Sequence, residues 1–136
     1  MEEEVLKTES ELNTISPLVW AYIGDSVYEL YVRTYLVKIT KLKPHKLHLE
    51  TIHYVKAKSQ ANILEKLKEN LTQEELEIIR RTRNTENHHL PQNTTISDYQ
   101  YATALEGLIG YLYLSGNKTR MYEILKLCVE YGNKQK

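Results

Sequence analysis

Apolar residues recur along the chain at helical spacing, and capping residues mark where most of these periods begin. Ser16 followed by Pro17 is a strong helix start, because Ser caps the first turn and Pro suits the first helical position. The apolar positions that follow predict a helix to about residue 37 or 38. Pro44 marks a second start, and the pattern from there to about residue 70 predicts either one long helix or two broken ones.

Both a helix and a loop are predicted in the middle of the chain. Thr72 and Glu75 have the spacing of a capping box and open a helix to about Arg83. Residues 84–97 are rich in Asn, Thr and His and lack periodicity, so they predict a loop. A loop of this length inside a compact domain is usually functional or disordered. Residues 1–15 are polar and acidic, and we expect a frayed lead-in there.

Two more helices complete the pattern. Ser97 or Asp98 is expected to cap a helix that runs to about Leu114. Thr119 or a neighbouring residue should open the last helix, which ends near residues 131–132. The sequence has no strand-type alternation and no internal repeat, so the predicted class is all-α.

Length and composition indicate one domain, residues 1–136. The chain is 41% hydrophobic and 26% charged, as is usual for a soluble globular protein. Its single cysteine, Cys128, lies in an apolar run, which fits a buried thiol and a reducing compartment. No apolar run approaches the length of a membrane span, and the acidic N-terminus is unlike a signal peptide. We therefore expect a cytoplasmic protein with no membrane partner.

The net charge is zero, which argues against a general nucleic-acid coat protein. Basic residues nevertheless cluster at residues 38–58 and 80–89. Either cluster can bind a polyanion locally or be a solvated helix face. The second cluster adjoins the long loop and is the better candidate for binding.

Several kinds of chemistry are excluded by the motifs that the sequence lacks. It contains no phosphate-binding P-loop, no dinucleotide-binding fingerprint and no Gly-x-Ser-x-Gly nucleophile elbow. A zinc cluster of the usual kind is excluded because there is only one cysteine.

Two acids stand in otherwise apolar helical segments. Asp25 and Glu106 have no other charged residue within three positions on either side. Glycines accompany both acids: Gly24 beside the first, Gly107 and Gly110 after the second. Glycine inside a helix costs about 1 kcal/mol relative to alanine, so its presence suggests close helix packing or a nearby ligand.

The two acids allow more than one interpretation. Each can be a surface acid on a narrow polar stripe, or one can form a buried ion pair with an arginine such as Arg33. Alternatively, two acids from distant parts of the chain meet at a divalent cation. Carboxylate oxygens are the ligands that Mg²⁺ prefers.

The segments around both acids resemble known motifs. Tyr22–Glu29 resembles the signature of the ribonuclease III family, and Ala104–Leu114 resembles its second motif, in the right order. The resemblance covers about residues 16–130, which leaves no room for a double-stranded-RNA-binding domain. This is typical of the small branch called Mini-ribonuclease III. Residues 79–84 also resemble that branch.

The chain departs from the larger family at several positions. Ala21 and Thr103 stand where the classical site has two further acids, and the Mini branch lacks these acids as well. Thr82 stands where a Gly is common. Glu29, one turn after Asp25, is either an outer-shell helper of the metal or a partner in a surface ion pair.

The resemblance implies an all-α ribonuclease III-like helical bundle that cleaves double-stranded RNA and leaves 5′-phosphate ends. It implies that Asp25 and Glu106 are catalytic and hold Mg²⁺, for which Mn²⁺ can substitute. It also implies a homodimer that matures the ends of precursor 23S ribosomal RNA. Apolar and Tyr side chains on residues 22–36 can form the dimer interface or belong to the core. The residues expected to contact RNA are Arg80, Arg81, Arg83, Asn84 and His88.

The competing hypothesis is a non-catalytic helical RNA-binding or ribosome-assembly protein that keeps the same fold. It follows from the absence of two of the four classical acids. Divalent-metal-dependent cleavage of a plain RNA duplex separates the two hypotheses.

Overall fold

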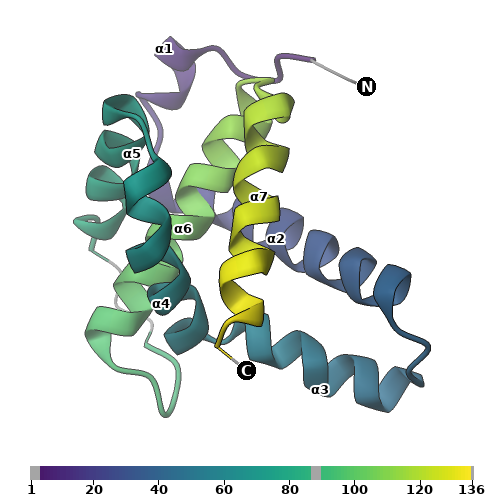
Figure 1. Cartoon of the computed structure of the whole chain (residues 1–136). Helices are drawn as coiled ribbons and strands as arrows, with labels where there is room; N and C mark the ends of the chain where they lie inside the picture. Colours follow the sequence, from purple (N-terminus) through teal and green to yellow (C-terminus); the bar gives the residue numbers. More distant parts are fainter. Residues whose placement is uncertain (1–3, 87–89, 136) are drawn as a thin grey trace.

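The computed structural model describes residues 4–86 and 90–135. The regular elements of these residues are all helical, as the sequence predicted, and Figure 1 shows their arrangement. None of the helices is long and apolar enough to cross a membrane. The elements in chain order are α1 (Glu9–Leu12), α2 (Pro17–Ile39), α3 (Pro44–Val55), α4 (Ala57–Leu67), the 3-10 turn η1 (Lys68–Asn70), α5 (Gln73–Arg83), α6 (Ile96–Leu114) and α7 (Lys118–Asn133).

Most helix starts lie where the caps predicted them. The Ser16 hydroxyl accepts a hydrogen bond from the Leu18 N–H at 3.2 Å, with Pro17 as the first residue of α2. The capping box at Thr72 and Glu75 is present at the start of α5. Between α3 and α4 the backbone of Lys56 is extended, with φ −63° and ψ 150°, so the stretch to residue 70 is broken rather than one continuous helix.

The start of α6 corrects the sequence prediction, which placed the cap at Ser97 or Asp98. The cap is Thr95, whose hydroxyl accepts a hydrogen bond from the Asp98 N–H at 3.0 Å. Asp98 therefore lies in the first turn, where its charge interacts favourably with the helix dipole. The helix begins at Ile96 and shortens the predicted loop by two residues.

The described part of the lead-in is docked, whereas the sequence predicted fraying. The N–H groups of Leu6 and Lys7 both donate to the Leu114 carbonyl at the end of α6, at 2.9 Å. Leu12 of α1 is fully buried, and its carbonyl accepts a hydrogen bond from the Trp20 indole at 3.1 Å. One buried leucine and its hydrogen bonds thus fix a segment whose composition is polar.

Helix α6 forms the centre of the bundle. Most of its residues are buried, and it packs against α2, α4, α5 and α7. In Figure 1, α2 crosses α6 obliquely, while α7 returns beside α6 in the opposite direction. A hydrogen bond links α2 to α3 within the core: the buried hydroxyl of Tyr28 donates to the Tyr54 carbonyl at 2.9 Å.

At the α2–α6 crossing the two backbones touch. A Cβ atom at Gly24 would overlap the Glu106 carbonyl and lie 2.9 Å from the Gly110 nitrogen. A Cβ atom at Gly110 would in turn overlap the Trp20 carbonyl and lie 2.9 Å from the Gly24 nitrogen. The two glycines therefore face each other, and no other residue type allows the helices this separation.

We predict that Gly24→Ala destabilises the protein. In an ordinary helix this change adds about 1 kcal/mol of stability. Here the new methyl group meets backbone atoms, which cannot turn aside as a flexible side chain can. We expect a net loss of about 1–3 kcal/mol or more in the free energy of unfolding, measured by urea denaturation.

Ser26→Ala is the matched control, because Ser26 lies two residues further along α2 and is exposed. It should leave the free energy of unfolding nearly unchanged. A Gly24→Ala protein as stable as the parent would show that the helices can separate at no cost.

Candidate active site

The α2–α6 crossing brings Asp25 and Glu106 together. Each acid is adjacent to the glycine contact, and their side chains lie close enough for a hydrogen bond. Asp25 is exposed and Glu106 is half-buried. Both line a cleft of about 540 Å³ whose walls come from α2, the α3–α4 junction, the loop before α6 and α6 itself.

Burial raises the pKa of Glu106 to about 8, and the negative charge of Asp25 adds to the shift. A hydrogen bond from Gln60 opposes the shift, while the more distant charge of Glu29 reinforces it. Near neutral pH, Glu106 therefore keeps a proton unless a cation replaces it. A carboxyl group whose pKa is raised by burial beside a second carboxyl group is typical of a metal site or an acid–base pair.

Arg33 does not pair with Asp25, one of the alternatives that the sequence left open. Its guanidinium binds Glu29 instead, with Nε to Oε2 at 3.0 Å and Nη2 to Oε2 at 2.7 Å. Glu29 is thus held in an ion pair on the outer part of α2. The negative charge of Asp25 and Glu106 is left for a ligand to neutralise.

These residues fit a hydrated divalent cation. Within residues 4–86 and 90–135, no group of three or more His, Cys, Asp and Glu residues could hold a metal ion. Two carboxylates are few ligands, but Mg²⁺ usually keeps several waters and binds proteins through one or two carboxylates. Ala21 and Thr103, which replace the two further acids, are small and line the same cleft, so they leave room for those waters.

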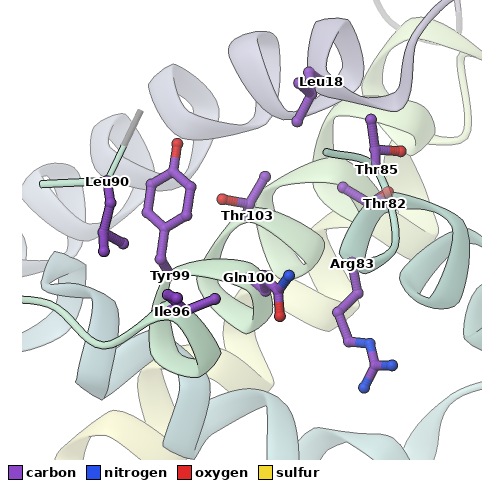
Figure 2. Close-up of a pocket in the computed structure, with 9 residues that line it drawn as sticks. All are labelled: Leu18, Thr82, Arg83, Thr85, Leu90, Ile96, Tyr99, Gln100 and Thr103. Atoms are coloured by element: carbon purple, nitrogen blue, oxygen red, sulfur yellow. The ribbon is translucent and has the colours of Figure 1, made fainter. Parts of the chain in front are cut away.

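A smaller pocket of about 240 Å³ adjoins the cleft and shares Leu18, Tyr99 and Thr103 with it. Figure 2 shows Arg83 at the end of this pocket away from Leu90, with its guanidinium pointing away from Leu18. The structure therefore places one of the predicted RNA-contacting residues in a pocket that adjoins the cleft of the two acids.

Arg83 is held by α6. Its Nη1 donates to the Tyr101 hydroxyl at 3.1 Å, and its Nε and Nη2 donate to the Asn84 Oδ1 at 3.3 and 3.2 Å. The guanidinium carbon lies 5.5 Å from the centre of the Tyr101 ring, and the Lys68 ammonium lies 5.0 Å from the same centre. Two cations thus gather at one aromatic ring near the cleft.

Arg80 and Arg81, two of the other predicted RNA contacts, are not brought together with Asp25 and Glu106. Arg80 binds Glu77 through a hydrogen bond of 2.8 Å from Nε. Arg81 donates to the Asn13 Oδ1 at 2.8 Å, stacks on Trp20 at 5.1 Å and lines a different groove, together with three glutamates. His88 lies outside the described residues.

The cleft also contains two residues that the sequence analysis did not select for the site. Lys56 lies in its wall at the break between α3 and α4, and Gln60 lies in the first turns of α4. Gln60 could have been found, because it shares an apolar stripe with Ile63, Leu64 and Leu67. Lys56 carried no comparable signal, since it is one of many lysines in its region.

Residues 18–117 match the Ribonuclease III domain family. The chain belongs to the ribonuclease III family. The protein named Mini-ribonuclease 3 from Thermoanaerobacter sp. is 42% identical over 130 residues, which cover 96% of this chain and 92% of that relative. The Mini-ribonuclease 3 of Staphylococcus aureus is 40% identical over 129 residues, covering 93% and 96%.

A crystal structure of a Fusobacterium nucleatum protein has the same fold, with a TM-score of 0.77 and 28% identity, and covers 88% of this chain and 95% of that one. These likenesses confirm the resemblance read from the two motifs and place the chain in the Mini-ribonuclease III branch. They make it an endoribonuclease of the ribonuclease III family, and favour this over a non-catalytic RNA-binding protein.

Proposed function

We propose that the protein is a divalent-metal-dependent endoribonuclease that cleaves double-stranded RNA and leaves 5′-phosphate and 3′-hydroxyl ends. The observation that carries the proposal is the meeting of Asp25 and Glu106, from two helices, in one cleft. Membership of the ribonuclease III family supports the substrate class. The resemblance to Mini-ribonuclease III is the ground for proposing precursor 23S ribosomal RNA as the natural substrate and the cytoplasm as its location.

Asp25 and Glu106 are the proposed ligands of Mg²⁺ or Mn²⁺. Held there, a divalent cation would supply a lowered pKa for the attacking water and a positive charge to stabilise the leaving 3′ oxygen. Asp25, on the exposed side, faces the incoming phosphate, whereas Glu106 is anchored against Gln60. The rigid crossing of α2 and α6 holds both carboxylates in position without help from the loop.

We propose that basic side chains around the cleft bind the RNA backbone. A-form duplexes are recognised largely through phosphates and 2′-hydroxyls. Lys56 in the cleft wall and Arg83 in the adjoining pocket, where Asn84 and Tyr101 fix it, are the proposed contacts. Arg80 and Arg81 contribute less, because the carboxylates of Glu74 and Glu77 lie in the groove that Arg81 lines.

An apolar face on α2 supports a homodimer. Val19, Tyr22, Leu30 and Val37 are exposed at helical spacing, with Tyr22 at 76% and Leu30 at 67% of full exposure. Beside them, α2 and α7 border an apolar hollow of about 380 Å³ that includes Leu30 and the exposed Tyr122. Ser26 and Arg33 are also exposed on this side of α2, so the face is apolar with polar interruptions. An exposed apolar patch on a helix often marks an interface. A second copy would give one cleft for each strand of a duplex, matching its approximate dyad.

Our first functional prediction is that Asp25→Asn abolishes cleavage while duplex binding persists. Asparagine keeps the shape of the side chain but removes the charge that holds a hard cation. Cleavage of an end-labelled RNA duplex with Mg²⁺ should fall to the level seen with chelator, and filter binding should change little. Glu29→Gln is the control, because Glu29 is paired with Arg33 outside the acid pair, and it should keep most activity. Near-parental cleavage by Asp25→Asn would refute the metal site.

The next prediction concerns Arg83. Arg83→Ala should weaken duplex binding and reduce the slope of log affinity against log salt by about 1, because one phosphate contact is lost. Arg81→Ala is the matched control, since Arg81 lines a different groove together with three glutamates, and it should leave the slope nearly unchanged. Equal slopes for the parent and Arg83→Ala would mean that Arg83 is only a solvated cation.

We also predict a dimer in solution. Sedimentation equilibrium at micromolar concentration should give about twice the 16.0 kDa mass of one chain. Leu30→Glu places a charge in the proposed interface and should yield the single-chain mass. Ile96→Glu is a control of equal exposure, 65% against 67%, on another helix, and should remain dimeric. A parent that stays at 16.0 kDa as concentration rises contradicts the dimer.

A further inference from the structure

Gln60 is a polar side chain buried at the wall of the cleft. The residue is only 2% exposed, although α4 otherwise buries Ile63, Leu64 and Leu67 on the same stripe. It lines the cleft together with Asp25 and Glu106. A buried glutamine side chain needs hydrogen-bond partners for both its amide nitrogen and its amide oxygen.

The amide nitrogen of Gln60 has two partners. Nε2 donates to the Val55 carbonyl at 2.8 Å and to the Glu106 Oε2 at 3.3 Å. The Val55 carbonyl can only accept, so only the nitrogen end of the amide can face it. This fixes the orientation of the amide, because the reverse arrangement would bring the amide oxygen against the Val55 carbonyl.

The amide oxygen has no partner. Among the buried side-chain nitrogen and oxygen atoms of the described residues, Gln60 Oε1 is the one without a hydrogen bond. Buried acceptors are almost always satisfied, so an exception next to a functional cleft calls for a donor that the protein itself does not supply. Asp25 and Glu106 are the proposed ligands of a cation, and the waters of a hydrated cation are strong donors.

We propose that Gln60 is a positioning residue of the metal site, holding the Glu106 carboxylate through Nε2 and accepting a hydrogen bond at Oε1 from a water of the bound cation. The inference rests on the proposed function, since it assumes a cation between Asp25 and Glu106. It assigns to a neutral amide part of the role that further carboxylates would play. Ala21 and Thr103 leave that role open, because neither offers a carboxylate to the cleft.

A purely structural role for Gln60 is the alternative. Its hydrogen bond to the Val55 carbonyl links the start of α4 to the last residue of α3. This link alone would explain why Gln60 is buried. That role uses only Nε2 and leaves Oε1 unsatisfied whether or not a cation binds. The two roles therefore differ in their dependence on the metal.

The decisive experiment is a crystal structure of the unaltered protein grown with Mn²⁺. We expect one ion between Asp25 and Glu106 and a water of its shell within hydrogen-bonding distance of Oε1. An ion at the two acids with no such water would overturn the inference and leave the proposed function standing. No ion at the two acids would overturn the proposed function, and with it the inference.

A variant measures the contribution of Gln60. Gln60→Met keeps the length of the side chain but cannot form these hydrogen bonds. We expect Mn²⁺ affinity, measured by electron paramagnetic resonance of the free ion, to fall about tenfold to a hundredfold, as is usual when a residue that orients a ligand is lost. The melting temperature without metal should fall much less than that of a cavity-creating core variant.

Thr51→Val is the matched control, because it removes another buried side-chain hydrogen bond, from Thr51 to the Leu47 carbonyl at 2.8 Å, away from the cleft. It should leave Mn²⁺ affinity unchanged. A folded Gln60→Met protein with parental Mn²⁺ affinity would refute the inference. If Gln60→Met does not fold, the Mn²⁺ crystal structure decides alone.

Discussion

The direct contact between the backbones of α2 and α6 is the constraint on which the site depends. Gly24 and Gly110 face each other at the crossing, and a side chain at either position would force the helices apart. The atom that a side chain on Gly24 would meet is the carbonyl of Glu106 itself. The same contact therefore sets both the packing of the core and the separation of the two acids. A site built on two long helices is held more precisely than one built on loops, which suits a centre with only two carboxylates to orient a cation.

The electrostatics of the cleft follow from which charges are already paired. Arg33 is paired with Glu29, and burial together with the charge of Asp25 raises the pKa of Glu106 to about 8. Without a cation, the negative charge at Asp25 and Glu106 repels a phosphate. A divalent cation bound at the two carboxylates would cancel their negative charge, and Lys56 and Arg83 at the surrounding surface would then attract a phosphate without opposition from the acids. A chain of zero net charge can thus bind a polyanion at one place, because its charges are distributed rather than in excess.

Sequence reasoning predicted local structure best where a cap gave a chemical reason, as at Ser16 and Thr72. It failed where a contact with a residue distant in the sequence determines the conformation of a segment or the partner of a side chain. The composition of residues 1–15 predicts fraying, yet Leu12 is fully buried. The backbone N–H groups of Leu6 and Lys7 donate to the Leu114 carbonyl. The arginines of α5 looked like one cluster because they are adjacent in the chain, but helical geometry sends Arg81 to Trp20 and Arg83 to Tyr101. Asp25 and Glu106 stood out because each is isolated among apolar residues, and the resemblance to the two family motifs joined them as a pair. Gln60 was not selected, because no motif accompanied its place in an apolar stripe.

The outer and inner faces of α2 connect the proposed assembly with the proposed chemistry. Tyr22 belongs to both, since it lines the cleft beside Asp25 and is also part of the exposed apolar face with Val19 and Leu30. A second copy docked on that face would therefore border the cleft rather than lie at a distance from it. In such a dimer the two acid pairs sit on either side of a two-fold axis, and each faces one strand of the same duplex. Residues that a single chain leaves exposed, Tyr22 above all, would then become part of the surface that holds the RNA, so that assembly and substrate binding depend on one helix.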